Sequence, residues 1–383
     1  MSQQQYPGFE TGPIRPPSEH ASLLLRVTRN CPWNRCRFCT LYKGSAFSIR
    51  RKEDVMADLD AVRACVDLLE KMAAGSGAEA EREFHALMAR LGSSGPEVCQ
   101  SAAAWFRAGM TSVFLQDANT MLVKPDDLVD ILAYLRALFP EVRRVTSYGR
   151  SHTIARISDE NLARLAGAGL NRIHIGMESG SDRILQLVDK GADKKTHITA
   201  GKKVKAAGIE LSEYYIPGLG GTEYSRENAL ETADAMNQID PDFIRIRTLS
   251  VPRTALLHKD YEDGIFVRSD DTDTAAELRL FISELKGIQS VVRSDHMLNL
   301  ITEVDGKLPE NQVKMLAALD WYLELPEEDK LVFRVGRRTG ILNSIADFGD
   351  SALRDTVARI CAQNDIRPDN ADIIIRKLMN RFL

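Results

Sequence analysis

Residues 26–44 read R-V-T-R-N-C-P-W-N-R-C-R-F-C-T-L-Y-K-G, and they contain three of the six cysteines of the chain, Cys31, Cys36 and Cys39. The apolar run S-L-L-L-R-V-T-R that leads into them is typical of a short β-strand that ends at a functional loop. Three thiolates on one short loop can converge on a single metal centre. The stretch therefore predicts a metal-binding loop at the end of the first strand.

The composition indicates a globular protein with one large α/β domain and an appendage, or with two domains. The chain has 383 residues, 44% of them hydrophobic and 27% charged, and a formal net charge of -4. A nucleic-acid binder usually has a basic surplus, so a nucleic-acid partner is less expected. We find neither a signal peptide nor a membrane span, and therefore expect a cytoplasmic protein with no membrane partner. Cysteines in that compartment stay reduced, which favours metal binding or catalysis over disulfides.

Helical and strand-like patterns alternate after the cysteine loop. The expected strands lie near residues 22–29, 111–117, 142–148, 171–177, 209–216 and 242–249. Such alternation predicts an α/β fold, a partial parallel (β/α)6 TIM-like barrel with its chemistry at the C-terminal ends of the strands. The expected domains are an N-terminal arm (1–20), the barrel (21–256) with a helical insertion at about 72–110, and a mostly helical C-terminal extension (257–383).

The residues of the cysteine loop leave four interpretations open. A zinc site would need a fourth ligand such as His20. A two-iron ferredoxin has the spacing C-x4-C-x2-C and a distant fourth cysteine, for which Cys65 is available. The thiols could also be unrelated to any metal. In the fourth interpretation, a four-iron cluster is held by only three cysteines, which leaves one iron open for chemistry. We expect Cys65, Cys99 and Cys361, which lie in helical patterns, to be packing residues.

The motif C-P-W-N-R-C-R-F-C resembles the cluster motif of the radical S-adenosylmethionine (radical SAM) superfamily, in a CX4CX2C variant of the usual C-x3-C-x2-C. The resemblance runs from about residue 22 to residue 256. The stretches I-G-M-E-S-G-S-D-R-I-L and Y-Y-I-P-G-L-G-G-T-E are similar to segments of the branch that includes methylthiotransferases and the elongator catalytic subunit. The resemblance implies a [4Fe-4S] cluster on Cys31, Cys36 and Cys39, and S-adenosylmethionine (SAM) as the second cofactor.

The resemblance also implies which residues contact SAM. Asp117, in the turn after the second strand, would accept the methionine ammonium. Glu178 would bind the ribose hydroxyls and Arg183 the methionine carboxylate, although a helix-start carboxylate and an exposed helix arginine are the plain alternatives. Ile216 and Gly218 would lie along the adenine, unless their segment is only a strand-to-helix turn. The full set of implied SAM contacts is Phe38, Asp117, Asn119, Glu178, Ser179, Arg183, Ile216 and Gly218.

The implied function is reductive cleavage of SAM to a 5′-deoxyadenosyl radical that abstracts hydrogen from a substrate, with a flavodoxin or ferredoxin as reductant. A small molecule or cofactor precursor, such as a tetrapyrrole, is the favoured substrate of this acidic chain. The alternatives are a tRNA- or peptide-modifying radical SAM enzyme, and a non-catalytic iron–sulfur electron-transfer protein with Cys65 as fourth ligand. Candidate substrate contacts are Tyr148, Arg245, Arg247 and His296, for which solvent-facing or purely structural roles are the alternatives.

Overall fold

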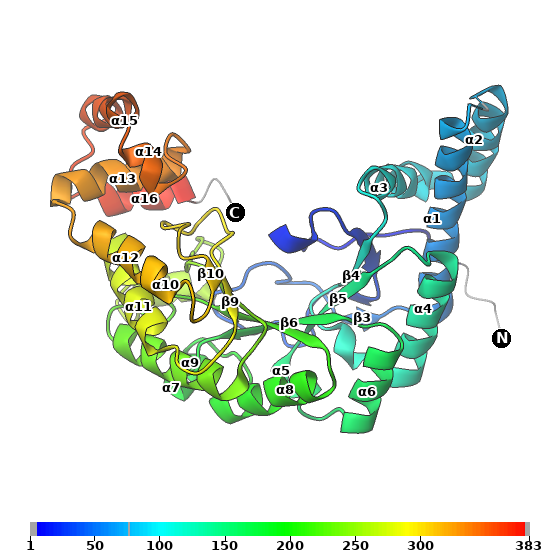
Figure 1. The fold of residues 1–383 in the computed structure, drawn as a ribbon, viewed down its shortest axis with the longest axis horizontal. Helices are drawn as coiled ribbons and strands as arrows, with labels where there is room; N and C mark the ends of the chain where they lie inside the picture. Colours follow the sequence, from blue (N-terminus) through cyan, green and yellow to red (C-terminus); the bar gives the residue numbers. More distant parts are fainter. Residues whose placement is uncertain (1–5, 76, 380–383) are drawn as a thin grey trace. The chain divides into compact units, whose positions relative to one another are not determined.

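The computed structural model describes residues 6–75 and 77–379, and its contacts divide the chain into two compact units (Figure 1). Unit 1 comprises Met1–Asn34, Leu41–Ile175 and Lys203–Glu210, and unit 2 comprises Arg35–Thr40, Gly176–Lys202 and Leu211–Leu383. Each unit is therefore built from discontinuous segments. Within the described ranges, no helix has both the length and the apolar character that crossing a membrane requires.

One mostly parallel sheet carries the site, with the strand order β1-β4-β5-β6-β7-β8-β9-β10. Its strands are β1 (Leu23–Arg26), β4 (Ser112–Gln116), β5 (Arg144–Gly149), β6 (Arg172–Glu178), β7 (Glu210–Tyr215), β8 (Phe243–Ile246), β9 (Val291–Arg293) and β10 (Gly306–Lys307). The first six are the predicted strands, and the partial parallel barrel is confirmed. We did not predict β9, which is parallel to β8, or β10, which is antiparallel to β9, because strands of two or three residues show no periodicity.

A separate two-stranded ribbon flanks the cysteine loop. It consists of β2 (Thr28–Arg29) and β3 (Ser48–Ile49), which pair antiparallel. The chain thus leaves the sheet after β1, forms the loop with the three cysteines, and returns through β3. This arrangement places the loop at the C-terminal end of the first strand, where the sequence predicts it.

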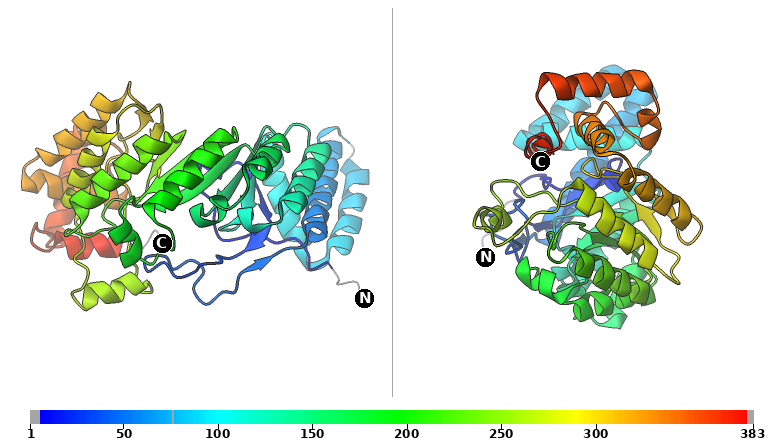
Figure 2. Two further views of the ribbon diagram at one scale, coloured as in Figure 1. Left: turned by 90° about the horizontal axis from the view of Figure 1, so that it is seen from below. Right: turned by 90° about the vertical axis from the view of Figure 1, so that its left-hand side faces the viewer.

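The helices of unit 1 follow the first strands of the sheet along the chain (Figure 2). They are α1 (Lys52–Ala73), α2 (Gly77–Leu91), α3 (Gly95–Arg107), α4 (Pro125–Leu138), α5 (Ser151–Ile154) and α6 (Asp159–Gly167), with short 3-10 turns at Pro17–Glu19, Gly92–Ser94 and Thr120–Leu122. The helices α2 and α3 occupy the predicted insertion. α6 begins where the sequence indicates, because the hydroxyl of Ser158 accepts from Asn161 N at 3.2 Å.

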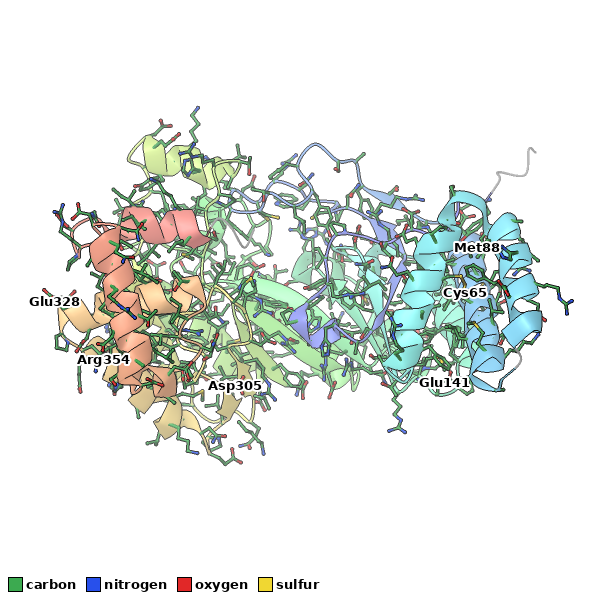
Figure 3. All side chains as sticks on the ribbon, turned by 90° about the horizontal axis from the view of Figure 1, so that it is seen from above. Cys65, Met88, Glu141, Asp305, Glu328 and Arg354 are labelled. Carbon is green, nitrogen blue, oxygen red and sulfur yellow. A yellow bond between two sulfur atoms is a disulfide. The ribbon has the colours of Figure 1, made fainter. Side chains whose placement is uncertain are left out.

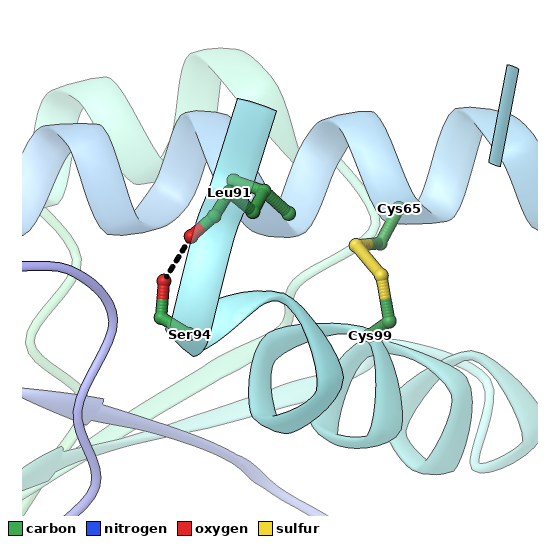
Figure 4. Close-up of a disulfide and its surroundings, with 4 residues drawn as sticks. All are labelled: Cys65, Leu91, Ser94 and Cys99. Carbon is green, nitrogen blue, oxygen red and sulfur yellow. Dashed lines mark hydrogen bonds between the residues drawn. A yellow bond between two sulfur atoms is a disulfide. The ribbon is translucent and has the colours of Figure 1, made fainter. Parts of the chain in front are cut away.

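A disulfide between Cys65 and Cys99 joins α1 to α3 (Figures 3 and 4). Their Cα atoms lie 5.5 Å apart, and Figure 4 also shows Ser94 donating to Leu91 O at 3.0 Å beside them. Our predictions that both cysteines are plain packing thiols, and that the cysteines of the chain stay reduced, are therefore wrong. Helix packing brings together two residues that are 34 positions apart, which no local pattern reveals. Cys361 is a buried thiol, as predicted.

Unit 2 contains the remaining helices, and the described part of the predicted extension (257–383) is mostly helical; its helices after β10 are drawn in orange to red in Figure 1. The helices are α7 (Asp182–Leu187), α8 (Lys194–Ala206, which ends in unit 1), α9 (Ser225–Ile239), α10 (Leu256–Glu262), α11 (Asp271–Glu284), α12 (Gln312–Leu323), α13 (Glu327–Thr339), α14 (Ile345–Phe348), α15 (Ser351–Gln363) and α16 (Ala371–Met379). The ring of Phe333 on α13 packs edge-on against Trp321 and Phe348, at 5.2 and 5.7 Å between centroids. This aromatic core holds the extension together.

Candidate functional site

Arg37, between the second and third cysteines, fixes the end of the cysteine loop in unit 2. Its backbone N donates to Val188 O at the end of α7, and its carbonyl accepts from Leu257 N at the start of α10, both at 2.9 Å. Its guanidinium forms a bidentate ion pair with Asp260 on α10, with Nε 2.7 Å from Oδ2. These bonds hold the segment that carries Cys36 and Cys39 between two helices. We did not predict them, because Asp260 is 223 residues away in the chain.

The donor set suits an iron–sulfur centre. Cys31, Cys36 and Cys39 are all thiols with partly exposed side chains, whereas a packing cysteine such as Cys361 is buried. Cys31 belongs to unit 1, and Cys36 and Cys39 belong to unit 2. Over the described ranges, no three His, Cys, Asp or Glu side chains are already gathered as a metal site. The three-cysteine ligand set therefore stays a prediction from the motif and its chemistry.

Phe38 connects the cysteine loop to the buried apolar side chains of unit 2. Its ring packs against two clusters of buried side chains, one containing Ile216 and Leu219 and the other containing Leu257 and Phe266. Leu249 packs against both clusters as well. Two residues predicted to contact SAM, Phe38 and Ile216, thus belong to one apolar region. Such a region excludes water from its surroundings.

Glu178, at the C-terminal end of β6, is held by an ion pair and by an unusual backbone conformation. Its φ is +69°, which is rare for a residue with a side chain and is typical of functional sites. Its Oε1 lies 2.9 Å from Lys190 Nζ, and both side chains are only 13% exposed. Since α7 begins four residues later with Ser181 as its cap, Glu178 is not a helix-start carboxylate. Lys190 also lies 6.0 Å from the centre of the Phe38 ring.

Gly176 provides the space that the Glu178 side chain occupies. A Cβ atom at position 176 would lie 2.1 Å from Glu178 Oε1 and 3.1 Å from Lys190 Nζ. No heavy atom can be accommodated at 2.1 Å from another that is not bonded to it. The glycine of I-G-M-E is therefore required for this placement of the carboxylate.

Glu213 on β7 is a second acid beside this ion pair, and the sequence analysis did not identify it. It is fully buried, and neither of its carboxylate oxygens has a hydrogen-bond partner in the described part of the chain. Burial, and secondly repulsion by Glu178, raises its pKa well above the usual value, while Lys190 opposes the shift. The neutral, protonated form of Glu213 is therefore favoured relative to an exposed glutamate. The signal in the sequence was an acid at an inward position of the strand I-E-L-S-E-Y-Y-I.

Ser179 and Arg183 differ in their surroundings from Glu178. Ser179 is buried, and its hydroxyl accepts from Ser181 N at 3.1 Å. Arg183 lies on the exposed side of α7, with its side chain 63% exposed and its guanidinium 5.1 Å from the ring of Tyr224. Its Nε is 3.7 Å from Glu227 Oε2. The role of Arg183 towards a carboxylate of SAM stays a prediction.

Gly218, in the turn after β7, is fixed by a buried acid of α11. Its φ of +84° favours glycine, and its backbone N donates to Glu277 Oε1 at 3.0 Å. The same oxygen accepts from Tyr215 Oη and from Asn228 Nδ2, both at 2.7 Å. Burial raises the pKa of Glu277 to about 7, although these hydrogen bonds oppose the shift. The loop predicted to contact adenine thus has a rigid, buried support.

Asp117 and Asn119, in unit 1, are both fully buried and hydrogen-bonded. Asp117 Oδ2 accepts from Arg26 Nη2 at 2.7 Å and from the backbone N of Asn30 at 3.0 Å, beside the first cysteine. Its Oδ1 has no hydrogen-bond partner among the described residues. Asn119 accepts from Arg150 N at 3.0 Å and therefore supports the neighbouring loop. The charge of Asp117 is already compensated by an arginine, which the sequence did not indicate.

The N-terminal arm covers Asp117 in unit 1. Gly12 exchanges hydrogen bonds with the Gln116 side chain, at 2.7 Å for Gly12 N and 3.1 Å for Gly12 O. A Cβ atom at Gly12 would collide with Asp117 Oδ1 at 1.8 Å. Glu10 accepts from Arg26 and Arg29. The arm predicted as residues 1–20 is therefore ordered over its described part from residue 6.

The candidate substrate residues fall into two places. Tyr148 belongs to unit 1, where its ring packs edge-on against Phe114 at 5.3 Å. Arg245 and Arg247 belong to unit 2 and share Asp295, at 2.6 and 2.9 Å. The two arginines thus have an anionic partner within the chain, and their contact with a substrate stays a prediction.

His296 follows directly after that shared carboxylate. Burial, and secondly the charge of Arg247, lowers the pKa of His296 to about 4. Its imidazole is therefore neutral at pH 7. Its Nδ1 accepts from Leu298 N at 3.3 Å, which gives it a local structural contact. A role in substrate binding stays a prediction.

Comparison with known proteins gives a family and several structural neighbours. The model of the family described as "Radical SAM superfamily" matches residues 25–233, which is more than half of the chain. The structure is similar to that of Elp3 from the archaeon Methanocaldococcus infernus (15% identity over 48% of each chain, TM-score 0.39). It is also similar to coproporphyrinogen III oxidase (HemN) from Escherichia coli (14% identity over 69% of this chain and 52% of that one, TM-score 0.46). A third neighbour is methylornithine synthase, PylB (11% identity over 78% and 68%, TM-score 0.43).

The chain spans about half the length of the Elp3 and HemN structures. No curated protein matches it significantly in sequence.

Proposed function

This chain belongs to the radical SAM superfamily and is an enzyme of that superfamily, and we propose that it cleaves SAM at a [4Fe-4S] cluster held by Cys31, Cys36 and Cys39. The match over residues 25–233 carries this proposal, because it includes all three cysteines and the Glu178 segment. When bound, the cluster supplies the electron that splits SAM into methionine and a 5′-deoxyadenosyl radical, which abstracts hydrogen from the substrate.

The residues of unit 2 support a SAM site beside the cysteine loop. Glu178 is a largely buried carboxylate whose ion pair with Lys190 uses Oε1, and its charge suits the two hydroxyls of a ribose. The apolar region of Phe38 and Ile216 suits an adenine and would keep water from a radical. Arg37 would hold the cysteine segment in place while SAM binds. Contacts of Asp117 and Asn119 with the methionine end stay a prediction from the resemblance, because both side chains are fully buried and hydrogen-bonded within unit 1.

We propose a small molecule or cofactor precursor as the substrate, and flavodoxin or ferredoxin as the reductant of a cytoplasmic enzyme. The net charge of -4 supports a small molecule over tRNA. A tight complex with tRNA that weakens steeply with salt would instead favour an RNA-modifying enzyme. Hydrogen abstraction from a peptide would favour a peptide modifier.

Anaerobic reconstitution with iron and sulfide tests the proposal. The loaded protein, given SAM and dithionite, should form 5′-deoxyadenosine, and Cys36→Ala should abolish both this product and the charge-transfer absorbance of the cluster. Cys361→Ala, which removes a thiol outside the motif, is the matched control and should retain both. Full cluster loading without any 5′-deoxyadenosine would refute the proposal.

A non-catalytic electron carrier would require Cys65 as the fourth cluster ligand. The Cys65–Cys99 disulfide weighs against that alternative, because its sulfur is already bonded. Loss of the cluster in Cys65→Ser, measured by iron content, would favour the carrier. Retention of the cluster, together with a spectral change when SAM is added, would favour the enzyme.

A further inference from the structure

A cavity of about 200 Å³ opens in unit 2 next to the loop that is predicted to contact adenine. Gly218 lines it from the turn after β7, and Thr248 and Leu249 line it from the segment after β8. The loop before α11 and the helices α13 and α16 complete the wall. The cavity therefore lies at the C-terminal ends of two strands, where parallel barrels bind their substrates. Leu249 connects it to the apolar region of Phe38.

Two arginines of this cavity have no anionic partner. The guanidinium of Arg268 lies 5.9 Å from the ring of Tyr261, and that of Arg376 lies 5.4 Å from the same ring. Arg376 Nη1 also donates to Tyr261 Oη at 2.6 Å. Within residues 6–75 and 77–379, no carboxylate is within ion-pair distance of either guanidinium. Burial, and secondly repulsion by Arg376, lowers the pKa of Arg268.

The acids that line the cavity are engaged elsewhere. Asp271 is held by Arg334 Nε at 3.1 Å and by Arg338 Nη2 at 2.6 Å. Arg334 also forms an ion pair with Asp372, through its Nη2 atom. Asp270 caps α11 by accepting from its backbone, and burial raises its pKa, so that its charge is disfavoured. These contacts leave Arg268 and Arg376 without a direct ion pair, although Asp271 and Asp372 still attract Arg268 from a distance.

Ser269 supplies an unsatisfied donor at the same place. Its hydroxyl lines the cavity, is buried, and has no hydrogen-bond partner in the described part of the chain. A buried hydroxyl without a partner is destabilising, so a ligand that accepts from it would be favoured. Two guanidinium groups and a hydroxyl donor form a set that matches an oxyanion.

We propose that this cavity binds a carboxylate group of the substrate through Arg268, Arg376 and Ser269. This assignment rests on the proposed function, since it places the acid of the substrate beside the SAM site. The volume of about 200 Å³ is below the roughly 300–1,000 Å³ of sites that enclose a whole drug-sized ligand. The cavity therefore anchors one acidic end, and the reacting carbon extends towards the cysteine loop. The substrate is a small carboxylic acid.

Binding of glutarate to cluster-free protein tests this assignment without relying on SAM chemistry. Glutarate should raise the unfolding temperature and protect Arg268 from phenylglyoxal, as measured by peptide mass spectrometry, whereas the neutral glutaramide should do neither. Arg268→Met, which keeps the apolar stem over Tyr261, should lower the affinity for glutarate at least about tenfold, as expected for the loss of a charged hydrogen bond. Arg268→Lys, which keeps the positive charge but cannot donate two parallel hydrogen bonds to a carboxylate, should have an intermediate affinity for glutarate.

Arg354→Met is the matched control, because Arg354 (labelled in Figure 3) is stacked over an aromatic ring, Phe348, outside the cavity. It should bind glutarate as the unmodified chain does. Equal effects of glutarate and glutaramide, or unchanged binding by a folded Arg268→Met, would overturn the assignment. Stronger protection by inorganic phosphate than by glutarate would overturn the choice of a carboxylate. If 5′-deoxyadenosine still forms in these cases, only the anchor fails and the proposed function stands.

Discussion

A single hydrogen atom at Gly176 decides where the Glu178 carboxylate can lie. The side chain of Glu178 turns back over its own strand, because its φ is in the left-handed region. There it occupies the space next to the Gly176 Cα and pairs with Lys190. The I-G-M-E segment thus combines Glu178, whose backbone is strained, with Gly176, which leaves room for the Glu178 carboxylate.

Gly176→Ala should weaken SAM binding and leave the fold intact. The added methyl group meets the ends of two long side chains, Glu178 and Lys190, and no backbone atom is among its nearest neighbours, so that the ion pair must move while the backbone need not. Loss of charged hydrogen bonds to the ribose would cost about 1.5–3 kcal/mol, or roughly a tenfold or greater rise in the Kd of SAM. Equilibrium dialysis of reconstituted protein measures this change.

Gly167→Ala is the control for that substitution, because a methyl group at the end of α6 meets nothing within 4 Å. It should bind SAM normally. If Gly176→Ala also binds SAM normally, Glu178 does not contact the cofactor.

At the scale of elements, α11 organises the turn that follows β7. Glu277 reaches from the helix to three donors, on β7, on the turn itself and on α9. Its pKa of about 7, against 4.5 for an ordinary glutamate, means that the folded state binds a proton more tightly than the unfolded state does. The contribution of this protonated group to stability is fully present below pH 4.5 and is lost as the pH rises through 7.

Glu277→Gln should therefore flatten the dependence of stability on pH. A shift from 4.5 to about 7 corresponds to about 3 kcal/mol of unfolding free energy, lost by the unmodified chain between about pH 4.5 and pH 7. Denaturant unfolding between pH 5 and pH 8 measures the slope. Glu213, whose pKa shifts in the same direction, leaves a residual slope in the variant.

Glu284→Gln, at the far end of the same helix, is the control and should retain the slope of the unmodified chain. An unchanged slope in Glu277→Gln would show that Glu277 does not titrate in this range.

At the scale of the whole molecule, the chain forms two units, and one disulfide crosslinks the first of them. Cys65 and Cys99 close a loop of 34 residues in unit 1, across the helical insertion. A crosslink of this length restricts the unfolded chain and stabilises the folded one by about 3–4 kcal/mol in the chain-entropy model.

Cys65→Ser should lower the free energy of unfolding by about this amount, and a thiol reductant should do the same to the unmodified chain. Denaturant unfolding with and without reductant, under anaerobic conditions, measures both effects. Cys361→Ser controls for the loss of a buried thiol; it keeps the disulfide and should lose stability with reductant as the unmodified chain does. The disulfide has no stabilising role if reductant leaves the free energy of unfolding of the unmodified chain unchanged and if Cys65→Ser has the same free energy of unfolding.

The sequence by itself determined the family, the six main strands and the cysteine loop, because alternating apolar patterns and the motifs around Cys31 and Glu178 are local in the chain. Packing alone decided the partners of charged groups and thiols, such as Asp260 for Arg37 and Cys99 for Cys65. The same holds for Arg268 and Arg376, which lie over one tyrosine ring although 108 positions of the sequence separate them. A pattern of hydrophobicity tells which face of an element is buried, but the charge or sulfur that it meets there depends on remote segments that only the tertiary structure brings together.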